Sequence, residues 1–272
     1  MKILKKKALW LTLYAIGITL VFLYLLFPSD IVKNKLEESV SSSDFTLKTG
    51  SLKPSLPFGL KMKHVNLSSG SSSNVFFQGE TLDVQFHPFN VFRKKKQIGL
   101  SGKAYGGNFS GHFQTATSGF YPPREGSLKF KDIDLGEYAF LKTLTGKHIT
   151  GKASGNWTHS SGGNGGGNLS GTMALFLNKG SYPLAEPFLG LSRIDFDRGE
   201  IQAKLENRVI KIEKLQIFSP QMDCALSGEI ALAEDFKNSP IHMSGEMILS
   251  GRKVKMNINI EGTIANPSLR YM

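Results

Sequence analysis

The sequence predicts a mostly β protein, with a single N-terminal transmembrane helix followed by an elongated, curled antiparallel β-sheet of repeating units and one or two short helices. Three observations carry this prediction: an uncharged apolar run at the N-terminus, alternation of apolar and polar residues beyond residue 44, and a short phrase ending in glycine that recurs along the chain. We expect four segments: a tip at 1–7, a transmembrane helix at 8–27, a linker helix at 28–43 and a β-rich domain at 44–272.

The N-terminal run has the features of an uncleaved membrane anchor. Residues 8–27 carry no charge, and a helix of this length covers about 30 Å, the thickness of the hydrocarbon core of a bilayer. Lysines at positions 2, 5, 6 and 7 precede it, which favours a cytoplasmic N-terminus. The alternative is a cleaved signal peptide, but the run is longer than a signal-peptide core and ends in Leu-Leu-Phe-Pro-Ser-Asp, without the small residues of a cleavage site.

A short helix and then strands are predicted after the anchor. Ser29 or Asp30 can cap a helix over residues 31–38. The clearest strand lies near the C-terminus, where Val254, Met256, Ile258 and Ile260 face one side and polar residues face the other. Such alternation is typical of antiparallel sheets with one covered face. Similar alternation is present at 60–67, 82–87, 128–131 and 200–206, and its phase slips between Ile212 and Leu215, which predicts a β-bulge.

Recurring glycines indicate a meander of repeating β units. Gly228, Gly245 and Gly262 are seventeen residues apart, a length that suits a strand, a turn and another strand. Glycine within strands also allows a sheet to bend strongly. Helical spacing predicts a short helix over 135–144, and a second short helical segment is expected within 183–191. The glycine-rich stretch 160–167 is expected to be a flexible hairpin loop.

Composition places limits on the class of protein. The chain is 40% hydrophobic and 20% charged, which favours a packed core over disorder, and no second run reaches eighteen apolar residues. The formal charge is +11, and removing the four N-terminal lysines leaves +7 for the rest. The basic cluster at 93–96 is interpreted as a solvated turn or a protected strand edge, with anionic lipid head groups as the alternative. Nucleic acid is not an expected partner, because the chain beyond the anchor faces away from the cytoplasm.

No motif in the sequence predicts catalysis. Cys224 is the only cysteine, which excludes an intrachain disulfide and a thiolate cluster, and its place in an alternating pattern predicts a buried, inert thiol. The carboxylate pairs Asp132/Asp134 and Asp195/Asp197 could do acid–base chemistry, but pairs near turns are more often solvated caps. The six histidines, at 64, 87, 112, 148, 159 and 242, show no paired spacing for a metal. We therefore predict a protein that is not an enzyme, with no cofactor and no catalytic, cofactor-binding or metal residues.

The order of segments resembles the type II secretion system protein N family, also called general secretion pathway protein N. The segments that carry the resemblance are 51–65, 82–84, 97–107, 133–155, 212–228 and 260–267. The last of them is also similar to the ends of AsmA-like envelope proteins. The resemblance implies a single-pass bacterial inner-membrane protein with a cytoplasmic N-terminus and a periplasmic β domain. It also implies an accessory role, with other secretion-system subunits as partners, in exporting folded proteins.

Two functions remain open at the level of sequence. The first is a structural accessory subunit of a type II protein secretion system. The second is an AsmA-like periplasmic protein that handles lipid or maintains the envelope and binds phospholipid acyl chains in an apolar groove. Both need a sheet with one apolar face. We expect a curled sheet that mostly fills its own interior, whereas a sheet that stays open would favour the lipid-handling function.

Overall fold

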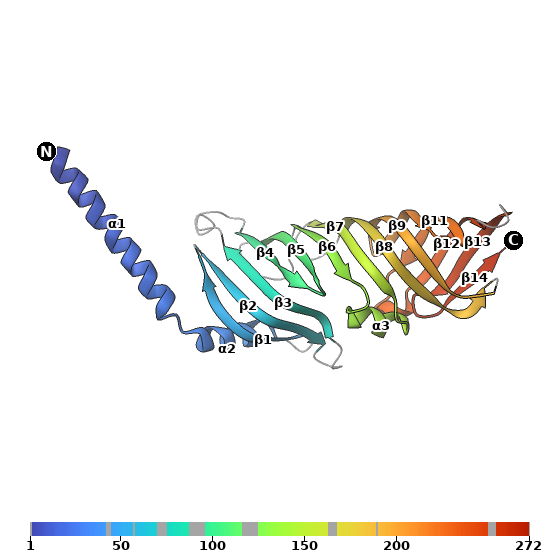
Figure 1. The fold of residues 1–272 in the computed structure, drawn as a ribbon, viewed down its shortest axis with the longest axis horizontal. Helices are drawn as coiled ribbons and strands as arrows, with labels where there is room; N and C mark the ends of the chain where they lie inside the picture. Colours follow the sequence, from blue (N-terminus) through green and yellow to red (C-terminus); the bar gives the residue numbers. More distant parts are fainter. Residues whose placement is uncertain are drawn as a thin grey trace.

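The fold is an elongated β-sheet preceded by two helices (Figure 1). The computed structural model describes residues 2–41, 45–56, 58–69, 75–86, 96–115, 125–162, 168–188, 190–249 and 254–271. The predicted mostly β class is confirmed.

All fourteen strands pair antiparallel in chain order, from β1 to β14, and β1 does not pair with β14. The sheet is therefore an open meander. The strands are β1 (Phe45–Ser55), β2 (Gly59–Ser69), β3 (Val75–Phe86), β4 (Lys96–Ala104), β5 (Gly107–Thr115), β6 (Glu125–Asp134), β7 (Thr150–Gly162), β8 (Asn168–Phe188), β9 (Leu191–Glu206), β10 (Val209–Phe218), β11 (Met222–Ala231), β12 (Pro240–Leu249), β13 (Val254–Thr263) and β14 (Pro267–Tyr271).

Two helices precede the sheet. Helix α1 (Lys2–Leu25) is followed by α2 (Ser29–Val40), which confirms the short helix predicted over 31–38. Pro28 lies at the junction, where its ring favours a break between helices. Within the described residues, no helix combines the length and the apolarity needed to cross a membrane, and the anchor predicted over 8–27 receives no support from the structure.

The regular glycine spacing corresponds to one strand per period, not to the predicted strand–turn–strand unit. Gly228, Gly245 and Gly262 lie on the successive strands β11, β12 and β13. Ten-residue strands with short connections give this spacing directly. The predicted bulge between Ile212 and Leu215 is confirmed, because the register of β10 against β11 shifts there.

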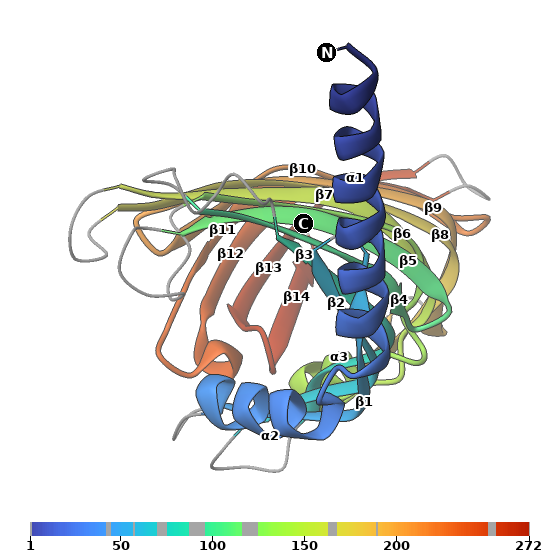
Figure 2. The same cartoon turned by 90° about the vertical axis from the view of Figure 1, so that its left-hand side faces the viewer.

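The sheet curls into a trough, with α2 and α3 (Ala139–Thr145) on the open side (Figure 2). Part of this curl comes from sharp bends within strands. In β2 the buried residues Met62 and Val65 are three apart instead of two, and His64 between them adopts a left-handed backbone conformation with φ of 52°. Asp132 in β6 and Lys179 in β8 also have positive φ, at 57° and 43°. Such residues shift the alternation of faces by one and turn the strand.

The two short helices predicted between strands have different outcomes. Helix α3 confirms the first in part, since it begins at Ala139 instead of 135 and ends at Thr145. Gly146 follows it in the left-handed conformation that commonly ends a helix. The helical segment predicted within 183–191 is wrong. Strand β8 continues to Phe188, and Pro183 lies opposite Arg193 of β9. Pro187 cannot donate a helical backbone hydrogen bond, and it lies between Pro183 and Phe188, where the register of β8 against β9 shifts.

Two predictions concern segments that lie wholly or mostly outside the described residues. The basic cluster at 93–96 lies outside the described residues except for the backbone of Lys96, which begins β4. The glycine-rich loop is described only to Gly162, and 163–167 lie outside the described residues.

Candidate functional site

One face of the sheet, called here the inner face, is apolar across the strands. Cross-strand register places apolar residues opposite one another, as for Met247, which lies between Cys224 of β11 and Met256 of β13. Helix α2 packs on this face, since its residues Val32 and Leu36 contact the buried residues of β1 and β2. The inner face is therefore the concave side of the trough in Figure 2.

The N-terminal end of the inner face is closed by α2. Leu52, Met62 and Val65 are only 1–3% exposed there. Partly buried apolar residues that pack against them are Phe27, Val32, Leu36, Leu47, Leu60, Phe77, Leu82 and Val84. Hydrogen bonds also tie α2 to the edge of β1, because the Thr49 N–H donates to the Glu37 carboxylate over 2.7 Å. This end of the trough is thus packed and protected.

The C-terminal end of the inner face packs on itself. Its buried residues are Ala203, Ile212, Met222, Leu226, Ile241, Met243, Met247 and Ile258. They come from five strands, β9 to β13, so side chains of the curled sheet meet one another without a covering helix. The predicted face of Val254, Met256, Ile258 and Ile260 is confirmed for the last three, which belong to this cluster or pack against it; Val254 is exposed.

Between the two packed ends, strands β4 to β8 present a stretch called here the middle inner face. It consists of Ile98, Leu100, Phe109, Phe113, Leu128, Phe130, Trp157, Leu175 and Leu177. All nine are only half-buried, and none belongs to either packed cluster. Neighbouring strands lie about 4.8 Å apart, so these side chains form rows across the sheet. Such rows suit an extended apolar molecule lying across the strands.

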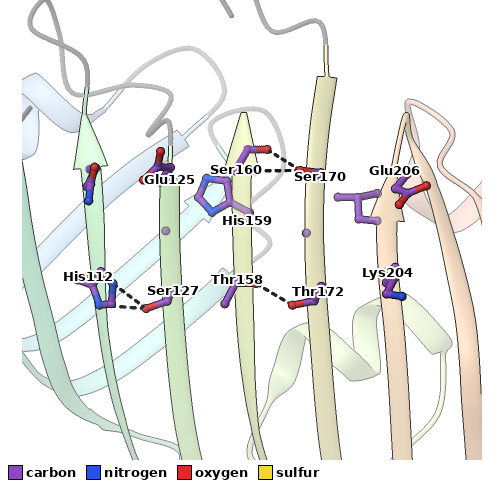
Figure 3. Close-up of a pocket in the computed structure, with 14 residues that line it drawn as sticks. His112, Glu125, Ser127, Thr158, His159, Ser160, Ser170, Thr172, Lys204 and Glu206 are labelled. Atoms are coloured by element: carbon purple, nitrogen blue, oxygen red, sulfur yellow. Dashed lines mark hydrogen bonds between the residues drawn. The ribbon is translucent and has the colours of Figure 1, made fainter. Parts of the chain in front are cut away.

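The opposite, polar face carries a hollow of about 580 Å³ over strands β5 to β9 (Figure 3). It is lined by His112, Gln114, Glu125, Gly126, Ser127, Thr158, His159, Ser160, Ser170, Gly171, Thr172, Lys204, Leu205 and Glu206. Cross-strand pairs of hydrogen-bonding side chains form a ladder in it. The Thr158 and Thr172 hydroxyls are 2.7 Å apart, those of Ser160 and Ser170 are 2.8 Å apart, and Ser127 Oγ lies 3.0 Å from His112 Nδ1.

The charged side chains of the hollow resemble those of an ordinary solvent-exposed sheet surface. Lys204 Nζ lies 2.5 Å from Glu213 Oε1, and this hydrogen bond raises the pKa of the lysine. The Oε1 atom of Gln114 is buried without a hydrogen-bond partner in the structure. The hollow can form hydrogen bonds with a polar molecule, but most of its hydroxyls are already paired with one another.

The residues considered for catalysis or metal binding are dispersed. His112 and His159 both line the hollow, but their rings lie on opposite faces of the sheet. The His112 ring contacts Ser127 Oγ, whereas the His159 ring stacks on Trp157 of the inner face, with ring centroids 4.6 Å apart. Asp195 pairs with Arg193 at 3.1 Å, and Asp134 accepts a hydrogen bond from the Gly136 N–H, as a turn cap does. His87 lies outside the described residues. Within the described part of the chain, no three His, Cys, Asp or Glu side chains come close enough to hold a metal ion.

Cys224 lies on the inner face and packs against the C-terminal cluster, half-buried rather than fully buried as predicted. Burial raises the pKa of its thiol to about 11. We therefore expect slow alkylation by maleimide at pH 8 in the folded chain and fast alkylation in urea. Between about pH 8.5 and pH 11 the thiol keeps its proton in the folded chain and loses it in the unfolded chain. Its contribution to stability is therefore complete below about pH 8.5 and is lost as the pH rises toward 11. Equal alkylation rates with and without urea would contradict this burial.

Comparisons with protein-family models, curated proteins and solved structures find no match for this chain.

Proposed function

We propose that this chain is a non-enzymatic envelope protein, anchored in a bacterial inner membrane by residues 8–27, that holds phospholipid acyl chains along the middle inner face. The observation that carries the proposal is the incomplete burial of that face. The sheet packs itself at its C-terminal end and is packed by α2 at its N-terminal end. The nine aliphatic and aromatic side chains of the middle inner face stay partly exposed between these ends.

The energetics favour an apolar occupant. Removing apolar surface from water contributes about 25 cal/mol per Å², or about 0.8 kcal/mol for each buried methylene group. An acyl chain across β4 to β8 would bury its own methylene groups and cover residues such as Leu128, Trp157 and Leu175 at the same time. The side chains are already held in place by the sheet, so little ordering of the protein opposes binding.

A second candidate function is a structural accessory subunit of a type II secretion system, acting in the periplasm. The observation that favours it is the uninterrupted pairing of fourteen strands. At about 4.8 Å per strand, such a sheet extends about 60 Å, which makes a firm spacer between a membrane and more distant subunits. The resemblance to the type II secretion system protein N family supports this role.

Native mass spectrometry of the full chain, released from detergent, tests the first function. We expect about one phospholipid retained per chain. The variant Leu175→Glu should retain at least fivefold less lipid, because it places a carboxylate on the middle inner face. The matched control is Phe176→Glu. Phe176 is the next residue along β8, it lies on the opposite face of the sheet, and its side chain is already 50% exposed.

The outcomes separate the two candidates. Equal lipid retention by Leu175→Glu and Phe176→Glu would contradict binding at the middle inner face. A lipid-free wild-type chain would reject the lipid-holding function. If deletion of its gene also blocks export of folded proteins, the structural accessory role would be favoured.

A further inference from the structure

We propose that the N-terminal end of the trough lies against the bilayer surface, with an apolar patch at the tip of the β1–β2 hairpin inserted among the head groups of anionic lipids. This patch, called here the tip patch, consists of Leu56, Phe58 and Phe86. The inference deepens the proposed function and rests on it, since it assigns how the trough meets the membrane that would supply its lipid.

The tip patch exposes large apolar side chains at one place. Leu56, Phe58 and Phe86 are 64%, 51% and 39% exposed. They are neighbours across strands, because the Phe86 N–H donates to the Phe58 carbonyl over 2.8 Å. Water-exposed residues of this size at a hairpin turn contribute nothing to the packed core. Insertion into the apolar edge of a bilayer would remove them from water.

Exposed apolar side chains are concentrated at this end of the molecule. Of the 21 large apolar side chains exposed in the described part of the chain, 16 precede residue 87. Nine of these belong to α1, and Leu26 and Ile31 flank the α1–α2 junction. Phe27, at that junction, packs against the buried cluster of Leu52, Met62 and Val65, which lies a few residues from the tip. The tip patch and the exposed apolar surface of the N-terminal helices therefore lie at the same end of the sheet.

The charge beside the tip patch is complementary to anionic lipids. Lys53 and Lys61 lie directly opposite each other on β1 and β2, and both are exposed. Like charges at opposed positions destabilise a sheet unless something neutralises them. Neither lysine forms an ion pair within the described residues. Asp83, opposite Lys61, instead accepts a hydrogen bond from the Ser55 hydroxyl over 3.0 Å.

This combination points to a lipid surface more than to a protein groove. Lysines behind an apolar tip can lay their aliphatic stems along the bilayer edge and place their ammonium groups among phosphates. The tip patch also leads onto the middle inner face, because Phe86 lies opposite Ile98, which lies opposite Phe113. This row of apolar side chains connects the membrane surface with the proposed acyl-chain site.

Fluorescence quenching in vesicles tests the inference with the full chain. The vesicles contain phosphatidylcholine and phosphatidylglycerol at about 4:1, with or without a lipid brominated near its head group. In a Cys224→Ala background, a dye is attached at Gln85→Cys, beside the tip patch, or at Ser268→Cys in β14. We expect quenching at position 85 at least threefold stronger than at position 268.

Variants identify the groups responsible. The double variant Leu56→Ser/Phe58→Ser should reduce quenching at position 85 by at least half, and Lys53→Gln/Lys61→Gln should do the same only in vesicles that contain the anionic lipid. Leu269→Ser, at an exposed site on β14, is the matched control and should change nothing. Equal quenching at positions 85 and 268 would overturn the inference.

A separate probe tests the anchor. Trp10 lies in α1. In a Trp157→Phe background it is the only tryptophan of the chain, and lipid brominated deep in its chain should quench its fluorescence if α1 enters the bilayer. If Trp10 is quenched but the dye at position 85 is not, the tip patch is rejected and the anchor stands. If the dye at position 85 is quenched but Trp10 is not, the tip patch is supported and the anchor is rejected.

Discussion

Gly245→Ala is expected to unfold the C-terminal half of the sheet at a much lower denaturant concentration than the wild type. Gly245 lies in the centre of β12, opposite Leu226 of β11 and Ile258 of β13. A Cβ atom at this position would meet the Ala225 carbonyl oxygen at 2.0 Å and the Leu226 Cα at 2.8 Å. Both obstacles are backbone atoms, so strands would have to separate, at a cost of about 3 kcal/mol. Urea unfolding of the full chain in detergent, followed by circular dichroism, measures it.

Gly99→Ala is the matched control for this result. Gly99 is also a strand glycine, but a Cβ atom there meets nothing closer than Gln85 Cβ at 3.8 Å. We expect no loss of stability, and a gain of about 0.5 kcal/mol from the smaller entropy of the unfolded chain. If Gly245→Ala and Gly99→Ala unfold at the same urea concentration, the close approach of the strands at Gly245 does not require glycine.

The sequence predicts the strands well because each strand has one apolar face. The alternation of Val254 to Ile260 identifies β13, and the phase slip after Ile212 identifies its bulge, because both follow from local side-chain periodicity. The helical segment predicted within 183–191 is wrong because the local sequence does not reveal the ladder that Pro183 shares with β9. That ladder depends on pairing with a second strand, in which Arg193 lies opposite Pro183.

The candidate site is predicted only in part. A sheet with an apolar face follows from the sequence, but the division of that face into packed ends and a partly exposed middle does not. Burial depends on the curl of the sheet, and residues such as His64 and Lys179, whose left-handed conformation helps to bend the strands, are ordinary polar residues in sequence. The expectation that the trough mostly fills its own interior holds at the C-terminal end, whereas Leu128 and Leu175 stay partly exposed.

Met247→Ala is expected to destabilise the chain by about 3 kcal/mol, because it removes a fully packed side chain from the C-terminal cluster. Met247 is 2% exposed and lies between Cys224 and Met256 on the inner face. Truncation of a buried methionine loses apolar burial and leaves a cavity that neighbouring strands cannot easily close. For a chain of this size, the loss corresponds to a fall in Tm of about 6–12 °C, measurable by thermal unfolding.

Ile248, the next residue along β12, provides the control that links the loss of stability in Met247→Ala to the curl of the sheet. Ile248 points to the opposite face and is 44% exposed, so Ile248→Ala should cost no more than about 0.5 kcal/mol. A flat sheet would leave both faces of β12 in water and make the two truncations similar. A large difference between adjacent residues requires that the inner face be closed on itself at this end, because no helix of the described chain covers Met247. Similar losses for the two variants would therefore contradict the self-packed end and, with it, the contrast on which the open middle inner face depends.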